Sequence, residues 1–227
     1  MRGRFLVIEG IDGSGKGTQV ELLVRRLKAL KVPVETIGFP EYGKPSAYFI
    51  EQYLRGSYGD IHFLGSRLPS VFFALDRFEA SFKIRDWLKR GKVVIADRYL
   101  ASNLGHQGGK IKNTTERRAF IKWLYNFEYG ILKIPKPDMS IILDLTAKIA
   151  YKLIGKKSRR HYLRGRKRDA HEMSEKYLHD SRRAYLEVAR IFPKEFKIIN
   201  CMRAGRLMTI AEIHEIIFKA MRRIIKI

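Results

Sequence analysis

The chain has 227 residues, with 46 lysines and arginines against 23 acidic residues and a formal net charge of +23. This length favours one domain with a single core over two independent domains. The single cysteine, Cys201, excludes an internal disulfide framework and favours a reducing compartment. No apolar run approaches the roughly 18 residues of a membrane-spanning helix.

The amino terminus begins Met1-Arg2-Gly3-Arg4 and continues into an apolar run, as a secretion signal does. The run ends at Glu9, however, and passes into a glycine-rich loop. We therefore expect a cytoplasmic protein without membrane association.

Phe5–Ile8 is the first strand candidate, and the stretch from Gly10 to Thr18 follows it. Its glycines let successive backbone N–H groups turn toward an anion, the next helix adds partial positive charge at its N-terminus, and Lys16 adds a full charge. Val20–Leu30 repeats apolar residues at helical spacing, so the stretch lies between a strand and a helix. The sequence predicts a phosphate-binding loop, in preference to a simple glycine-rich turn.

This loop departs from the strict phosphate-loop pattern, in which Ser or Thr follows the lysine directly. Here Gly17 follows Lys16, and Thr18 comes one position later. Because Gly17 has no hydroxyl, Mg²⁺ is expected to depend on phosphate oxygens, water and a carboxylate elsewhere. Gly-Lys-Gly-Thr-Gln also occurs in nucleoside-monophosphate kinases such as adenylate kinase, so the departure favours phosphoryl transfer to a small substrate.

Four further strand candidates alternate with helical patterns along the chain: Val34–Ile37, Val93–Ala96, Ser140–Leu145 and Phe196–Ile199. This alternation predicts an α/β fold, a five-stranded parallel sheet with helices on both faces. We expect one domain over residues 1–227, with a core of residues 1–151 and 173–227 and a short lid at about 152–172. In such sheets ligands bind beyond the carboxyl ends of the strands.

Two segments carry candidate binding residues, one at the end of the third strand and one in the helix before it. Asp97 and Arg98 follow the third strand, where a carboxylate can hold Mg²⁺ through water and a guanidinium can bridge two anions. Phe73 and Arg77 lie one helical turn apart in the upstream helix. They share a face, so the ring can stack on a base while the guanidinium binds a phosphate. The alternatives are a surface ion pair for the first segment and core packing for the second.

The positive charge is concentrated between Lys152 and Arg168, and a milder cluster lies in the last helix. Such an excess attracts polyanions. One alternative is therefore a nucleic-acid-binding protein with a non-catalytic phosphate loop, whose binding would fall steeply with salt. The intact loop argues against this as the main activity, and we expect nucleic-acid binding to be weak and nonspecific.

Five segments resemble the thymidylate kinase family, a family with the P-loop NTPase fold, in the order and at the distances that this family shows. The resemblance extends over nearly the whole chain. Its segments are Glu9-Gly10-x-Asp12-Gly13-x-Gly15-Lys16, Phe39-Pro40-Glu41-Tyr42, Phe73-Ala74-Leu75-Asp76-Arg77, Asp97-Arg98-Tyr99-x-x-Ser102-Asn103 and Pro135-Lys136-Pro137-Asp138.

The resemblance implies a role for each matching residue. Lys16 would contact the transferred phosphoryl group, Asp97 would assist Mg²⁺ through water, and Arg98 would hold the acceptor phosphate. Phe73 would stack on thymine, and Asp12 would lie near both donor and acceptor. The implied ATP site consists of Gly10, Asp12, Gly13, Ser14, Gly15, Lys16, Gly17 and Thr18. The implied dTMP site consists of Asp12, Phe39, Tyr42, Phe73, Arg77, Arg98, Ser102, Asn103, His106, Gln107, His171 and Glu172.

The resemblance implies a catalytic basic residue, which some thymidylate kinases take from the phosphate loop and others from the lid. Positions 11 to 14 of the loop are Ile, Asp, Gly and Ser here, so an arginine of the basic segment is expected to supply it. The candidates, in order of preference, are Arg168, Arg164 and Arg160. An arginine supplied in this way can raise the rate by roughly 10³-fold or more. His106 and His171 stand where many relatives have tyrosine, and the aromatic at the first position is thought to exclude a ribose hydroxyl.

The predicted function is therefore ATP-dependent conversion of dTMP to dTDP with Mg²⁺. One alternative is a kinase for another or broader set of pyrimidine monophosphates, such as dUMP and UMP. A third possibility is an inactive relative that retains the fold, against which Lys16, Asp97 and Arg98 argue. The resemblance also suggests a homodimer formed through helices that include the Phe72–Phe82 region.

Overall fold

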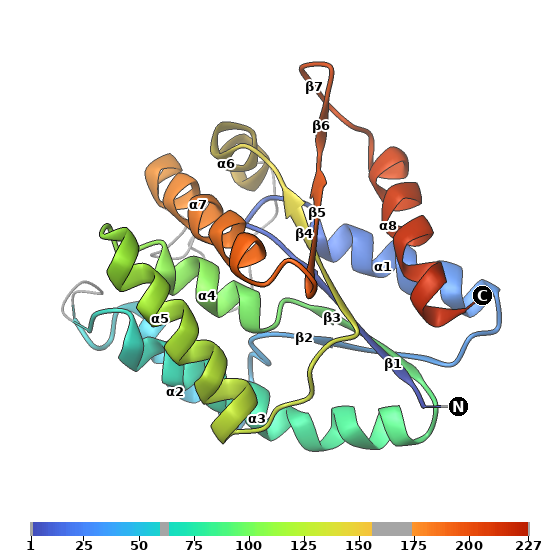
Figure 1. The fold of residues 1–227 in the computed structure, drawn as a ribbon, viewed down its shortest axis with the longest axis horizontal. Helices are drawn as coiled ribbons and strands as arrows, with labels where there is room; N and C mark the ends of the chain where they lie inside the picture. Colours follow the sequence, from blue (N-terminus) through green and yellow to red (C-terminus); the bar gives the residue numbers. More distant parts are fainter. Residues whose placement is uncertain (1, 60–63, 156–173, 227) are drawn as a thin grey trace.

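The computed structural model describes residues 2–59, 64–155 and 174–226. Its main sheet has five parallel strands in the order β2-β3-β1-β4-β5, which confirms the predicted sheet (Figure 1). The central strands are buried on both faces, because helices cover both sides of the sheet. The strands are β1 (Arg4–Glu9), β2 (Val34–Gly38), β3 (Val93–Asp97), β4 (Met139–Asp144) and β5 (Phe196–Asn200).

Helices pack on both faces of this sheet, as the alternating pattern predicted. Figure 1 shows α1 and α8 together on one side, and α3, α4, α5 and α7 on the other. The helices are α1 (Lys16–Ala29), α2 (Tyr48–Arg55), α3 (Arg67–Lys89), α4 (Leu100–Gly108), α5 (Thr114–Asn126), α6 (Ala147–Gly155), α7 (Glu175–Ile191) and α8 (Ile210–Ile225), with the short turns η1 (Pro45–Ala47) and η2 (Phe127–Ile131).

Two local features differ from the sequence prediction. Leu30, expected on the buried face of the first helix, lies past its end and is 52% exposed. A short antiparallel hairpin, β6 (Met202–Arg203) and β7 (Arg206–Leu207), extends beyond β5. Ala204 and Gly205 between these strands both have positive φ, as a tight hairpin turn requires.

The predicted lid begins inside α6. Residues 152–155 form the last turn of this helix, and Ile154 is buried there. The rest of the predicted lid, including Arg160, Arg164, Arg168, His171 and Glu172, lies outside the described residues. The lid boundaries stay a prediction.

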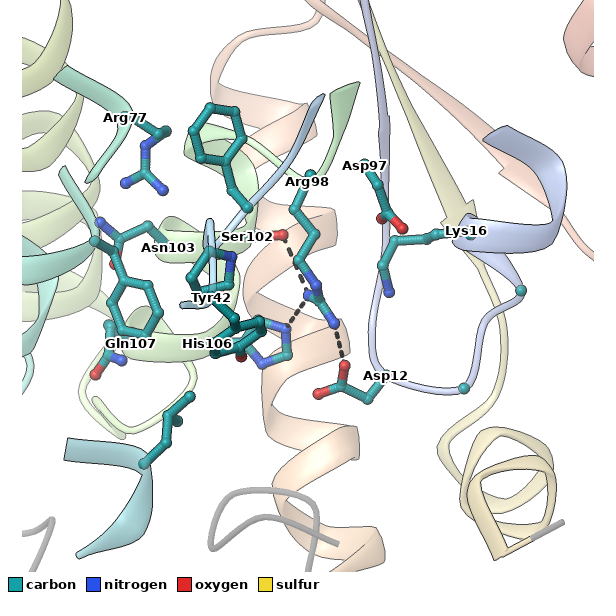
Figure 2. Close-up of a pocket in the computed structure, with 18 of the residues that line it drawn as sticks. Asp12, Lys16, Tyr42, Arg77, Asp97, Arg98, Ser102, Asn103, His106 and Gln107 are labelled. Atoms are coloured by element: carbon teal, nitrogen blue, oxygen red, sulfur yellow. Dashed lines mark hydrogen bonds and ion pairs between the residues drawn. The ribbon is translucent and has the colours of Figure 1, made fainter. Parts of the chain in front are cut away.

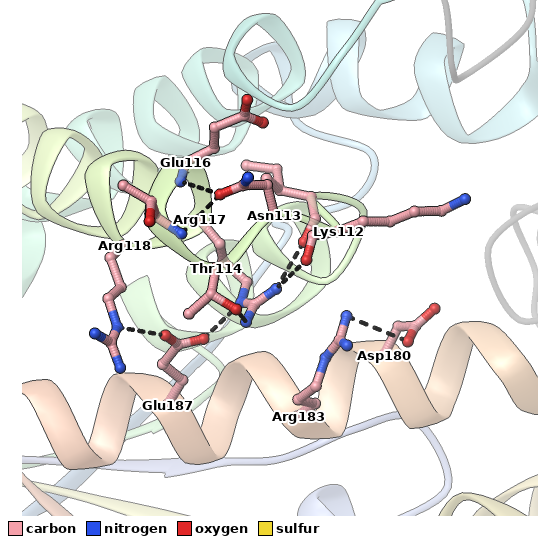
Figure 3. Close-up of polar contacts among 11 residues, drawn as sticks. Lys112, Asn113, Thr114, Glu116, Arg117, Arg118, Asp180, Arg183 and Glu187 are labelled. Atoms are coloured by element: carbon pink, nitrogen blue, oxygen red, sulfur yellow. Dashed lines mark hydrogen bonds and ion pairs between the residues drawn. The ribbon is translucent and has the colours of Figure 1, made fainter.

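A buried ion pair joins α5 to α7 (Figure 3). Arg117 donates to Glu187 at 2.5 Å, and Arg118 donates to the other oxygen of the same carboxylate at 2.9 Å. Burial raises the pKa of Glu187, but these two arginines outweigh that effect and leave the pKa below its usual value. Arg117 also donates to the carbonyl oxygens of Ile111 and Lys112, so one side chain fixes the loop before α5.

Cys201 is buried, and burial raises the pKa of its thiol to about 12, with a smaller contribution from Asp144. It therefore packs as a small apolar residue and is not a reactive thiol. Across the described residues, every helix is too short or too polar to cross a bilayer.

Candidate active site

The loop between β1 and α1 has the backbone of an anion cradle. Gly10, Gly13 and Gly15 all have positive φ. A side chain at Gly10 would come within 2.7 Å of the Leu143 carbonyl oxygen, and one at Gly13 would strike the Ala150 carbonyl oxygen. Only glycine satisfies both the conformation and the close approach. The loop thus wraps closely around the N-terminus of α1, where the first amides of the helix face an incoming phosphate.

Lys16 lies at the start of α1 and is 6% exposed. Its Nζ donates to the Ile11 carbonyl oxygen at 2.9 Å, so the side chain folds back over the loop. Burial, and then the charge of Arg98, lower the pKa of Lys16 to about 8, although Asp12 and Asp97 act in the opposite direction. A polyanion that enters the loop therefore stabilises the charged form of Lys16.

ATP binding at pH 8 is expected to be accompanied by uptake of roughly half a proton, because about half of Lys16 is neutral there and the triphosphate raises its pKa again. At pH 6 Lys16 is already charged, so this uptake should disappear. Titration calorimetry in two buffers of different ionisation enthalpy measures the uptake directly. In Lys16→Arg the guanidinium stays charged throughout, and an equal uptake in that variant would contradict the assignment.

The turn after β3 places Arg98 in a conformation that is unusual for its residue type. Arg98 has a φ of 69°, in the left-handed region that costs a non-glycine residue roughly 1–3 kcal/mol. Three hydrogen bonds hold the turn. Arg98 N donates to Ile8 O at 3.0 Å, Phe39 N donates to Asp97 O at 3.0 Å, and Tyr99 N donates to Glu9 Oε1 at 2.8 Å. Strain held in this way is typical of a functional position.

The guanidinium of Arg98 is the centre of a polar network, which Figure 2 shows. It bonds to the Asp12 carboxylate, donates to Ser102 Oγ at 3.3 Å and contacts His106 Nε2 at 3.0 Å. Burial lowers the pKa of Arg98, but the Asp12 carboxylate outweighs this effect together with Tyr185, Asp97 and Glu9, and the net pKa is raised well above its ordinary value. Arg98 is therefore a permanent cation beside the phosphate loop.

Glu9 supports this network through its side chain; the sequence placed it in a matching segment but gave it no role. Its side chain is fully buried and accepts hydrogen bonds from Tyr99 N, from Ser102 Oγ at 2.7 Å and from the Tyr185 hydroxyl at 3.4 Å. Burial raises the pKa of the Glu9 carboxyl, while the Ser102 hydrogen bond and the charge of Arg98 act against this. These contacts tie β1 to the β3 turn, α4 and α7.

The other end of the site is built on a second buried pair. Arg77 donates through Nε and Nη2 to both oxygens of Glu128, at 2.6 and 2.5 Å, and the two side chains are 2% and 0% exposed. Two of its five N–H donors are thus engaged in the pair, and the guanidinium lies at the end of the cavity away from Lys16 (Figure 2). Sequence reasoning missed Glu128, which lies among aromatic residues 51 positions away.

Asn103 lies beside this pair, with its amide oriented by its neighbours. Its Nδ2 donates to Ser70 O at 2.9 Å and to Glu128 Oε1 at 3.2 Å. Its Oδ1 is buried and accepts no hydrogen bond within the described structure. An acceptor and the Arg77 guanidinium therefore share one end of the pocket.

One cavity of about 370 Å³ joins these groups. The sequence-predicted residues that line it are Asp12, Gly13, Gly15, Lys16, Gly17, Phe39, Tyr42, Phe73, Arg77, Asp97, Arg98, Ser102, Asn103, His106 and Gln107. Gly10, Ser14 and Thr18 lie in the loop or the first turn of α1 and do not line it. Gly38, Pro40, Leu54 and Tyr177 also line the cavity and were not predicted.

Asp97 suits a Mg²⁺ site at the phosphate end. Its Oδ1 is buried without a hydrogen-bond partner in the described structure, and its Oδ2 lies 3.4 Å from the position of a side chain at Gly17. Mg²⁺ usually takes one or two protein carboxylates and completes its shell with phosphate oxygens and water. One unpartnered carboxylate beside a phosphate loop meets that requirement.

The fold and this cavity define a P-loop enzyme of the nucleoside-monophosphate kinase class. The family model for thymidylate kinase matches residues 8–208. A thymidylate kinase of Mycobacterium tuberculosis is 34% identical over 188 residues, covering 82% of this chain and 85% of the relative. A probable thymidylate kinase of Pyrococcus abyssi is 34% identical over 223 residues, 95% and 94% of the two chains. The chain belongs to the thymidylate kinase family, whose members are ATP-dependent kinases.

A solved thymidylate kinase from Candida albicans shares the fold. It superimposes with a TM-score of 0.74 over 98% of this chain and 92% of that chain, at 22% sequence identity. The likeness extends over nearly all of the chain.

Proposed function

We propose that this protein transfers the γ-phosphoryl group of ATP to dTMP, with the base of dTMP held between Phe73, Arg77 and Asn103. The observation that carries the proposal is the pair of groups at the end of the cavity away from the phosphate loop (Figure 2). Asn103 Oδ1 is a buried acceptor without a partner in the described structure, and the Arg77 guanidinium is a donor. Thymine presents N3–H and O4 side by side, a donor and an acceptor.

This pattern selects among bases. Cytosine presents an acceptor at N3 and an amino donor at position 4, the reverse of thymine, and would leave both protein groups unpaired. Because an unpaired buried polar group costs free energy, such a site rejects cytosine strongly. Uracil has the same N3–H and O4 and differs only by the methyl group, whose recognition falls to apolar neighbours such as Phe39 and Pro40.

The phosphate end of the cavity supports the transfer itself. Arg98 and Lys16 supply fixed positive charge close to one another, and Asp12 keeps the Arg98 guanidinium oriented toward the loop. Aligning and neutralising donor and acceptor phosphates supplies most of the catalysis in this reaction class. Asp97 is the residue that would hold Mg²⁺, which when bound neutralises charge on the phosphate oxygens.

A further arginine is proposed from the basic segment that follows α6. Within residues 10 to 18 Lys16 is the only lysine or arginine, so the loop contributes a single side-chain cation. Arg160, Arg164 and Arg168 are the candidates, and they lie outside the described residues. This part of the proposal rests on their sequence position alone.

The test is ADP release measured with ATP and a panel of monophosphates: dTMP, dUMP, UMP, dCMP and AMP. We expect dTMP to have the highest kcat/KM, with dUMP roughly 10- to 200-fold lower because one methyl group distinguishes them. The value for dCMP should be lower than that for dTMP by at least roughly a hundredfold. Equal or better activity with dCMP or AMP would overturn the proposal.

We also propose a homodimer that forms through α3. Leu75 and Phe82 lie on this helix, within the predicted region, and are 46% and 60% exposed. Large apolar side chains exposed on one helix mark a candidate protein–protein contact. Sedimentation equilibrium decides between one copy and two. The expected cytoplasmic location stays a prediction.

A further inference from the structure

Both ring nitrogens of His106 have polar partners, which a ring that only packs would not need. It lies on α4 with one ring nitrogen toward Arg98 and the other toward Tyr177, at 3.0 Å in each case. We propose that His106 is a positioning residue, which orients the Arg98 guanidinium toward the acceptor phosphate by accepting a hydrogen bond from it. This inference rests on the proposed function, because it concerns the affinity for dTMP.

The hydrogen bonds fix the tautomer of His106. A guanidinium has only donors, so Arg98 Nη1 must donate and His106 Nε2 must accept. The hydrogen of the neutral ring is therefore on Nδ1, and it is donated to the Tyr177 hydroxyl oxygen. Tyr177 in this way sets the protonation pattern that lets His106 serve Arg98.

The ring is also held in place by packing. Tyr177 stacks on it with ring centroids 5.8 Å apart, and Tyr185 meets it edge-on at 5.7 Å. Tyr177 is itself fixed near the start of α7, where Ser174 caps the helix by accepting from Tyr177 N at 3.0 Å. A side chain at Gly105 would strike the Tyr185 ring, so α4 and α7 are in close contact here. The Tyr185 ring that meets His106 edge-on is therefore tightly packed.

Protonation of His106 would break this arrangement. The charged ring has no acceptor, and it would place a second cation against Arg98. Among the described residues, the charged and titratable groups facing the ring are Arg98 from the β3 turn and Tyr177 and Tyr185 from α7, with Asp12 and Glu9 behind Arg98. Protonation of this ring therefore makes the affinity for dTMP depend on pH, in addition to the titration of the dTMP phosphate itself.

The experiment compares His106→Leu, His106→Gln and Tyr177→Phe with the wild-type enzyme at pH 7.5. Leucine fills the space without an acceptor, and KM for dTMP should rise at least about tenfold, as expected for loss of a hydrogen bond to a charged group. Glutamine offers an oxygen near the position of Nε2 and should recover most of that loss. KM for ATP should change by less than about threefold in all three, as the contact is on the acceptor side.

The pH profile separates positioning from packing. Between pH 7.5 and 5.5 KM for dTMP should rise more steeply in the wild type than in His106→Gln, by about tenfold, because glutamine does not titrate. The phosphate of dTMP titrates near pH 6, and the glutamine variant carries that effect equally. Parallel profiles, or an unchanged KM in His106→Leu, would overturn the role of His106.

A spectroscopic readout does not depend on activity. In protein labelled with ¹⁵N-histidine, the resonances lost in His106→Gln identify the ring, and at pH 7.5 they should report hydrogen on Nδ1. In Tyr177→Phe the preference for hydrogen on Nδ1 should weaken, because the hydroxyl that accepts this hydrogen is removed. A ring with hydrogen on Nε2 in the wild type would refute the inference. If the wild-type enzyme releases no ADP with dTMP, the proposed function itself fails, and the tautomer measurement still stands.

Discussion

Replacing Lys16 with methionine is expected to lower kcat for dTMP by roughly 10²- to 10³-fold, the loss typical of removing one fixed group that stabilises transition-state charge. Lys16 is buried at the N-terminus of α1, and its Nζ already lies over the loop. Methionine keeps the length and the apolar stem but removes the charge. Because burial already disfavours the lysine ammonium, the folded state should lose little stability.

A coupled assay at saturating ATP and dTMP measures the effect, and thermal unfolding checks the fold. Lys28→Met is the matched control, since Lys28 lies on the same helix with an exposed side chain, and its kcat should stay within about twofold. A Lys16→Met enzyme with kcat within about tenfold of the wild type would show that the loop does not hold the transferred phosphate.

The sheet and the phosphate loop could be predicted because their signals are local. Each predicted strand is a short apolar run, and in the structure the residues of β1 and β3 are buried by helices on both faces. The loop needs glycines and a lysine adjacent in the chain, and its positive φ angles lie at Gly10, Gly13 and Gly15. The hairpin of β6 and β7 was missed, since strands of two residues are too short to show a period.

The buried acids that organise the site could not be predicted, since their partners are far away in the sequence. Glu9 meets Ser102 across 93 positions, and Arg77 meets Glu128 across 51. A sequence shows which residue types are present but not which of them meet in space. The sequence placed Arg77 in the expected dTMP site, but its pairing with Glu128 is seen only in the structure.

His106 illustrates the same limit. The sequence marks it only as a histidine at a position where many relatives have tyrosine. Within the described structure, its hydrogen-bond partners Arg98 and Tyr177 come from the β3 turn and from α7, 8 and 71 positions away. The tautomer, and with it the proposed role, follows only once both distances are known.

Replacing Glu128 with glutamine is expected to lower the free energy of unfolding by about 3–5 kcal/mol, because it leaves the Arg77 guanidinium buried without a counter-charge. The pair is 2% and 0% exposed, so water cannot replace the lost carboxylate. In the wild type Asn103 Nδ2 donates to the Glu128 carboxylate. In the variant it would face a glutamine amide instead. Affinity for dTMP should fall with stability, since Arg77 and Asn103, the side chains proposed to contact the base, both donate to this carboxylate.

Urea unfolding measures the change, and Asp86→Asn is the matched control. Asp86 pairs with Arg90 one turn away on α3 at 3.0 Å, with side chains 49% and 66% exposed, so its loss should cost under about 1 kcal/mol. Equal losses in the two variants would contradict the burial argument. Replacing both Arg77 and Glu128 by apolar residues should recover much of the stability, as removal of a whole buried pair often does. That variant should still bind dTMP weakly, which would separate the contribution of the pair to folding from its contribution to base recognition.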